Sequence, residues 1–109
     1  MPLTYKVLGQ NNPSASGLTT LYTVPSATQA VVSSFSVCNL LNTATTYRLA
    51  VRPTGEAIAN KHYLVYDASL PANDTTILTI GVSLDTTDIV SVYAASSGVS
   101  FSLFGTEVT

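Results

Sequence analysis

Ionic side chains are scarce in this sequence. Asp, Glu, Lys and Arg make up 9% of the 109 residues, against about 25% in a typical soluble protein. With four basic residues and a net charge of −2, the chain cannot neutralise a row of phosphates, so we expect no nucleic-acid partner. The polar surface is mainly hydroxyl and amide, which can be desolvated at lower cost than ions. Such a surface favours tight contacts with other proteins.

Cysteine is nearly absent as well. Cys38 is the only one, which excludes an intrachain disulfide and a multi-cysteine zinc site. It follows Val37 in a β-like run, so we predict that it is a small buried hydrophobe. No run approaches about 18 apolar residues, and the first 25 residues lack the pattern of an export signal. We therefore expect that the protein has no membrane partner and that it needs no oxidising compartment in order to fold.

The apolar residues that remain are abundant, at 46% of the chain. This is enough to offset the conformational entropy lost on folding, so disorder is not expected. The length fits one domain. We assign residues 1–109 to a single β-sandwich domain, with residues 1–17 as an N-terminal strand or a docking arm.

The clearest strand signal is an alternation of period two in which Tyr47, Leu49 and Val51 share one side of the chain and Arg48 shares the other with Arg52. Eight segments read as short strands: 3–9, 18–24, 30–38, 47–52, 62–67, 74–80, 88–95 and 99–103. Turn residues separate them. Residues 56–61 could form one helical turn but are too few for a stable helix, so we interpret them as a loop excursion. The sequence predicts an all-β fold, an antiparallel β-sandwich or a jelly-roll-like barrel of about eight strands.

Few residues suggest chemistry. His62 is the only histidine and could act as a general base, but no nucleophile motif accompanies it. We interpret it as a polar residue at the start of a strand and predict that the chain is not an enzyme. Four aspartates lie near predicted turns, where this residue type ordinarily stabilises the turn: Asp67, Asp74, Asp85 and Asp88. Their spacing is not that of a calcium loop, so we expect no metal and no cofactor.

Four residues are candidates for a protein interface. Arg48 and Arg52 project from one face of a strand, where each could pair with a carboxylate of a neighbouring subunit or lie solvated. Tyrosine suits contact surfaces because it combines apolar area with a hydroxyl. Tyr93 shares a side with polar Ser91 and is the best candidate for an exposed contact, and Tyr5 is a further one. Tyr47 is expected in the core.

Several segments together suggest a family. The opening residues 4–10 (TYKVLGQ), followed by 21–25 (LYTVP), resemble small virion structural proteins of tailed phages, notably those infecting cyanobacteria and other aquatic bacteria. Further stretches are similar in character: 37–39, 47–53, 66–67, 72–75 and 101–105. The likeness extends over nearly the whole chain. Its motifs are structural rather than catalytic.

The resemblance implies a protein of the virion, assembled in the host cytoplasm. With no long shaft segment in the chain, we expect a capsid decoration or cement protein that stabilises the head, packed on the major capsid protein as a homo-oligomer, a trimer. One alternative is a tail, baseplate or fibre adaptor or receptor-binding module. Another is a carbohydrate-binding module that holds host sugar through exposed tyrosines. Fold analogy alone does not choose among these functions.

Overall fold

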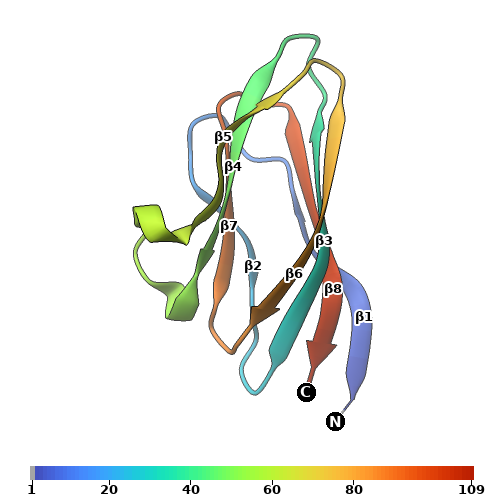
Figure 1. The fold of residues 1–109 in the computed structure, drawn as a ribbon, viewed down its shortest axis with the longest axis vertical. Coiled ribbons are helices and arrows are strands. Elements are labelled where there is room, and N and C mark those ends of the chain that lie inside the picture. Colours follow the sequence, from blue (N-terminus) through green and yellow to red (C-terminus); the bar gives the residue numbers. More distant parts are fainter. Residues whose placement is uncertain (1) are drawn as a thin grey trace.

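Two four-stranded antiparallel sheets pack face to face (Figure 1) in the computed structural model, which describes residues 2–109. The strands are β1 (Leu3–Asn11), β2 (Thr19–Thr23), β3 (Gln29–Asn39), β4 (Thr45–Arg52), β5 (Tyr63–Leu70), β6 (Thr75–Leu84), β7 (Ile89–Ala94) and β8 (Val99–Val108). Between β4 and β5 lie two short 3₁₀ turns, η1 (Pro53–Gly55) and η2 (Asn60–His62). No helix in this described part of the chain is long and apolar enough to cross a membrane.

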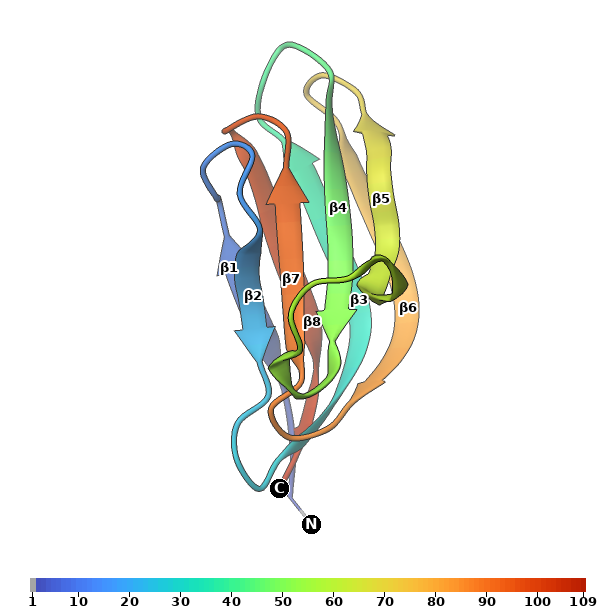
Figure 2. The ribbon, with the colours of Figure 1, turned by 90° about the vertical axis from the view of Figure 1, so that its left-hand side faces the viewer.

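The strand order defines a jelly roll. One sheet has the order β1-β8-β3-β6 and the other β2-β7-β4-β5. Strands pair in a nested way, first with last: β1 with β8, β2 with β7, β3 with β6 and β4 with β5. Such a long hairpin, rolled into two sheets, is the double Greek key of jelly-roll domains. Figure 2 shows the β2-β7-β4-β5 sheet in front, with the β4–β5 excursion lying across its lower half.

Alternating side chains from both sheets fill the core. Phe35 of β3 and Phe101 of β8 stack with ring centroids 5.9 Å apart, and Tyr47 of β4 reaches both rings from the opposite sheet. All three are buried. Burial also raises the pKa of the Tyr47 hydroxyl, since it disfavours the charged form. The expected core role of Tyr47 is confirmed.

Two glycines allow backbone segments to approach closely. A Cβ on Gly9 would lie 2.2 Å from the carbonyl oxygen of Leu21, and one on Gly105 would lie 2.1 Å from that of Val31. Real Cβ atoms do not come so near. Gly9 therefore lets β1 pass against β2 of the other sheet, and Gly105 lets β8 lie against β3.

The predicted fold class is confirmed, and each of the eight expected strands exists. The differences are at the ends: the strands predicted at 74–80 and 99–103 extend to residues 84 and 108. The loop excursion expected at residues 56–61 is present and is longer, from residue 53 to residue 62, with a 3₁₀ turn at each end. At the N-terminus, β1 is hydrogen-bonded along β8 over residues 3–11.

Candidate interaction surfaces

The outer side of the β1-β8-β3-β6 sheet has no charged side chain among residues 2–109. We call it the uncharged face, and it consists of Leu3, Tyr5, Val7, Gln10, Gln29, Val31, Ser34, Ser36, Cys38, Thr75, Ile77, Thr79, Gly81, Ser83, Ser100, Ser102, Phe104, Thr106 and Val108. Five of its apolar members are exposed, and the largest exposed fractions are those of Tyr5 at 78% and Ile77 at 67%. This face offers apolar, hydroxyl, amide and thiol groups and no ion.

The dimensions of this face suit a protein contact. Four strands about 4.8 Å apart and roughly ten residues long, at about 3.3 Å per residue, give a flat area of about 600 Å². A specific interface typically buries about 800 Å² on each partner. One sheet face with its adjoining loops thus approaches the size of a complete interface.

The outer side of the other sheet is built around Arg48 of β4. Its guanidinium carbon lies 4.2 Å from the ring centroid of Tyr66 and 4.2 Å from that of Tyr93. Tyr63 lies 5.9 Å away and meets Tyr66 edge to face, with centroids 4.9 Å apart. We call Arg48, Tyr63, Tyr66, Asp67 and Tyr93 the arginine–tyrosine cluster. Its cation lies between aromatic faces, in the geometry of a cation–π contact.

A β-bulge in β5 assembles this cluster. Tyr47 pairs with Ala68 and Leu49 with Val65, so two residues of β5, Tyr66 and Asp67, lie opposite Arg48 alone. Asp67 has a φ of 51°, a left-handed conformation that Asp tolerates better than most residues. Bulges re-aim side chains in this way, and here the bulge gives Arg48 a ring and a carboxylate together.

Asp67 binds the guanidinium at two points. Arg48 Nε donates to Asp67 Oδ1 at 2.6 Å and Nη2 to Oδ2 at 3.3 Å. The hydrogen bonds to Asp67 raise the pKa of Arg48 above its usual value, so the group stays charged at every physiological pH. Its charge is compensated within its own chain. The prediction that Arg48 pairs with a carboxylate of a neighbouring subunit stays a prediction.

Arg52 lies on the same side of the sheet and holds the excursion. Its Nε donates to the hydroxyl of buried Ser91 at 3.1 Å, and its Nη1 donates to the carbonyl oxygen of Glu56 at 3.0 Å. The excursion lies over Ser91, which explains why a residue on the outer side of a sheet is buried.

His62 is a structural residue of this excursion. It is 4% exposed; its Nδ1 accepts from the backbone N–H of Ala59 at 3.0 Å, and its Nε2 lies 3.1 Å from Glu56 Oε1. Because Nδ1 accepts, the proton of the neutral ring is on Nε2 and points to Glu56. The bond from His62, together with nearby Lys61, lowers the pKa of the Glu56 carboxyl. Both ring nitrogens are thus engaged in holding the loop.

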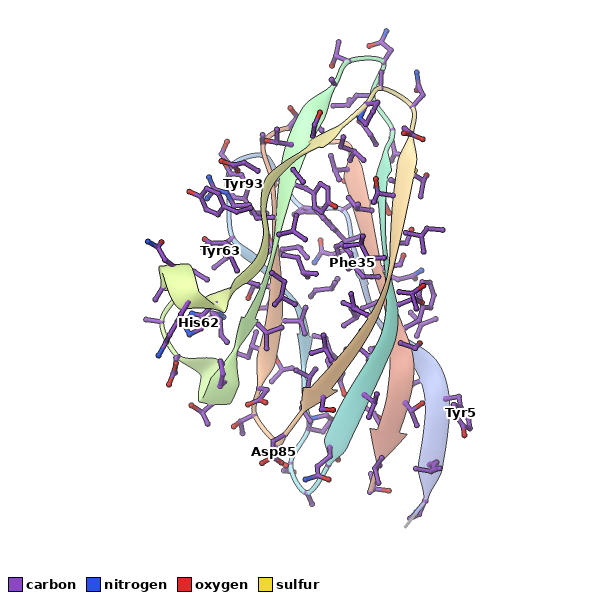
Figure 3. The ribbon with its side chains drawn as sticks, in the orientation of Figure 1. Tyr5, Phe35, His62, Tyr63, Asp85 and Tyr93 are labelled. Carbon is purple, nitrogen blue, oxygen red and sulfur yellow. The ribbon has the colours of Figure 1, made fainter. Side chains whose placement is uncertain are left out.

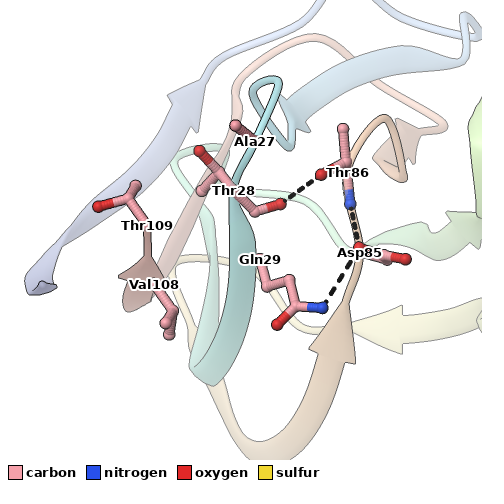
Figure 4. Close-up of a pocket in the computed structure, with 7 residues that line it drawn as sticks. All are labelled: Ala27, Thr28, Gln29, Asp85, Thr86, Val108 and Thr109. Carbon is pink, nitrogen blue, oxygen red and sulfur yellow. Dashed lines mark hydrogen bonds between the residues drawn. The ribbon is translucent and has the colours of Figure 1, made fainter. Parts of the chain in front are cut away.

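The aspartates of the β6–β7 turn act on backbone groups. Asp88 accepts from the N–H of Thr54 and of Asp85, each at 2.9 Å. Asp85 accepts from the N–H of Thr86 at 2.8 Å. A hollow of about 320 Å³ lies at this end of the sandwich. Figure 4 shows the residues that line it, among them Thr86, whose Oγ1 donates to the carbonyl oxygen of Thr28. No group of three metal-ligating side chains occurs among the residues that the structure describes.

The two sheets are joined by a polar contact at the edge of the core. The hydroxyl of Tyr22 in β2 donates to Glu107 Oε2 of β8 at 2.6 Å, and Lys6 Nζ lies 3.3 Å from Glu107 Oε1. Burial, with a smaller effect of Glu107, raises the pKa of Tyr22. The bond from Tyr22, aided by Lys6, lowers the pKa of Glu107.

The prediction that Cys38 is buried is wrong. Its side chain is half-buried on the uncharged face, where it lies opposite Ser100 and Thr75. The reason is the alternation of β3, in which Val37 and Asn39 point inward and Cys38 must therefore point outward.

The four interface candidates lie on opposite sides of the molecule. Arg48 and Tyr93 are in contact, and Arg52 lies on the same sheet; Tyr5 belongs to the uncharged face (Figure 3). Sequence reasoning missed Tyr63 and Tyr66 as partners of Arg48. Both belong to the strand that follows the excursion, but the bulge that aligns them with Arg48 has no signal in the sequence.

Comparison with known proteins shows the fold alone. No protein-family model matches the chain, and no curated protein matches it. Among solved structures it is similar to a chain in the structure of infectious bursal disease virus, Gx strain, with a TM-score of 0.50 and 11% identity. The match covers 97% of this chain and 31% of that one. The present chain thus spans about a third of the length of its viral neighbour.

Proposed function

We propose that this chain is a structural protein of a virus particle and that it decorates the head of a tailed phage as a cement protein. It acts by binding and carries out no chemistry. The uncharged face is the observation that carries the proposal. A sheet side with exposed Tyr5 and Ile77 and no ion to desolvate can be covered at little electrostatic cost.

Two further observations support a place in a virion. The jelly roll is an architecture found in viral capsid domains, as well as in lectins and cupins, and a chain of a virus structure has a similar fold. The segments at residues 4–10 and 21–25 resemble small virion proteins of tailed phages. The fold and the segments are independent of each other, since one is a topology and the other a local sequence.

The proposed mechanism is burial of apolar area across the joints of the shell. The uncharged face packs on the major capsid protein or on sibling copies, which form a trimer. Symmetry repeats each contact, and neighbouring attachment points hold every copy at a high effective concentration. A modest single contact thereby becomes a stable coat.

Immunogold labelling of intact particles of the phage that encodes the chain tests this proposal. Label on the head alone is the expected result, with three copies per attachment point in a cryo-EM map of the same particles. Label confined to the tail would overturn the head assignment in favour of a tail or baseplate adaptor. Particles without label, at a chain level detectable in the infected cell, would overturn the virion role altogether.

A further inference from the structure

The side of the molecule opposite the uncharged face holds a hollow beside the arginine–tyrosine cluster. Asn60, Tyr63 and Tyr66 line it, and its volume is about 450 Å³. Tyr66 is 58% exposed, so one of its lining rings is open to a ligand. This hollow is separate from the surface on which the proposed function depends.

The two rings form a corner rather than a groove. Their planes meet at 81°, with centroids 4.9 Å apart, so one ring can serve as a floor and the other as a wall. Asn60, whose amide offers both a donor and acceptors, is the third residue that lines the hollow. Apolar walls with a few convergent polar groups are the composition of small-ligand sites.

The charges around the corner are already paired. Asp67 holds Arg48 from one side, and Glu56 lies 3.6 Å from Lys61 and 3.1 Å from His62. A cationic ligand would meet the guanidinium of Arg48, which already lies over the ring of Tyr66 at 4.2 Å from its centroid. An anionic ligand would have to compete with Asp67 for the guanidinium. The local charge balance therefore favours a ligand without charge.

The corner is also held in place before any ligand arrives. Arg48 lies between Tyr66 and Tyr93 at 4.2 Å from each ring, and its two bonds to Asp67 fix the plane of the guanidinium. On the other side, buried His62 holds the η2 turn that carries Asn60. A site that is ordered in advance loses less entropy on binding.

We infer that this corner binds a neutral saccharide, with the C–H face of a sugar ring on Tyr66 and its hydroxyls bonded to Asn60. A sugar ring has the required chemistry, because it has apolar C–H faces, a rim of hydroxyl donors and acceptors, and no charge. A proline-rich peptide is a weaker fit, since such segments dock in extended aromatic-lined grooves and these two rings are nearly perpendicular. The inference does not depend on the chain's being part of a virion.

The experiment applies the intact chain to an array of neutral and acidic oligosaccharides, then measures the best neutral one by titration calorimetry. Tyr66→Ala is expected to weaken binding at least about tenfold, and Tyr66→Phe, which keeps the ring, to change it by less than about threefold. Tyr5→Ala on the opposite face is the matched control and should leave binding unchanged. Because the ligand is uncharged, raising NaCl from about 0.05 to about 0.5 M should not alter the affinity.

Three results would overturn the inference. They are retention of acidic glycans only, retention of no glycan at all, and equal effects of Tyr66→Ala and Tyr5→Ala on glycan binding. Thermal unfolding of each variant shows that it is folded, which is expected because both side chains are exposed. Loss of glycan binding would leave the immunogold result unaffected, so this inference and the proposed function can fail separately.

Discussion

The two outer sides of this sandwich have the same architecture, four antiparallel strands each. They differ in the kinds of side chain that they expose to solvent. On the uncharged face, outward positions are filled by apolar side chains and by uncharged polar ones, mainly hydroxyls. On the other side, Arg48 and Arg52 are present, but each is bonded within the chain, Arg48 to Asp67 and Arg52 to Ser91. The first surface exposes apolar side chains with no charge beside them, whereas the charges of the second are paired within the chain. The difference shows that the few charged residues of this chain are unevenly placed and are absent from one face of the sandwich.

The largest expected effect comes from placing a charge on the uncharged face. Ile77→Glu inserts a carboxylate at an exposed position of its edge strand β6, and burying it without a partner costs several kcal/mol. We expect binding to phage heads, measured by co-sedimentation, to fall at least about a hundredfold. Ser69→Glu places the same charge on an exposed position of the opposite side and should bind normally. Equal loss in both variants would remove the contrast between the two faces.

A second prediction concerns the contact that joins the two sheets. Tyr22→Phe removes the hydroxyl that donates to Glu107 at 2.6 Å. A hydrogen bond to a charged group contributes about 1.5–3 kcal/mol, and we expect a loss of that size in the free energy of unfolding at pH 7, measured with urea. Docking on phage heads should be retained, because neither side chain belongs to the uncharged face.

The same contact gives a pH dependence whose sign follows from the shifted pKa values. The pKa of Glu107 is lowered in the folded state, so its stabilisation is present above the ordinary Glu value of about 4.3 and is lost as the pH falls through the folded-state value. The pKa of Tyr22 is raised, so stability also declines above about pH 10. Tyr22→Phe should flatten both slopes. A variant whose acid slope equals that of the wild type would show that Tyr22 does not hold the carboxylate.

The third prediction isolates the excursion over the β2-β7-β4-β5 sheet. His62→Ala removes two hydrogen bonds, to Ala59 and Glu56, at about 1 kcal/mol each. We expect a loss of about 1–2 kcal/mol in unfolding free energy and faster amide hydrogen exchange confined to residues 53–62. An equal rise of exchange in β1 and β8 would show that His62 stabilises the whole sandwich rather than the excursion alone.

The sequence predicts the sandwich because its physical signal is local. Tyr47, Leu49 and Val51 alternate with Arg48 along a single strand, and period two is visible without knowing what the strand pairs with. The strand order is not visible in this way, since nested pairing joins residues about a hundred positions apart, such as Leu3 and Val108. For the same reason the uncharged face could not be assembled from the sequence.

The contacts between surface residues are even harder to predict from the sequence than the strand order. Arg48 and Tyr93 could be chosen separately as outward residues, but their contact depends on the pairing of β4 with β7. The contact of Tyr66 with Arg48 depends on the bulge of β5 and on the left-handed conformation of Asp67. No neighbouring residue in the sequence predicts either feature. The residue type alone predicts a buried Cys38, whereas the two-residue period counted from inward-pointing Val37 predicts that it points outward. Periodicity within a strand was the better guide.

The smallest effect on stability is expected at Arg48, whose charge is already paired with Asp67. Arg48→Lys keeps the charge but loses the planar fork that binds Asp67 at two points. Exposed ion pairs contribute little, about 0–1 kcal/mol, so unfolding free energy should change by less than about 1 kcal/mol. The sensitive readout is instead the aromatic ¹H NMR shifts of Tyr66 and Tyr93, which should move because the flat guanidinium no longer lies between their rings. Unchanged ring shifts together with unchanged stability would mean that Arg48 does not order this side.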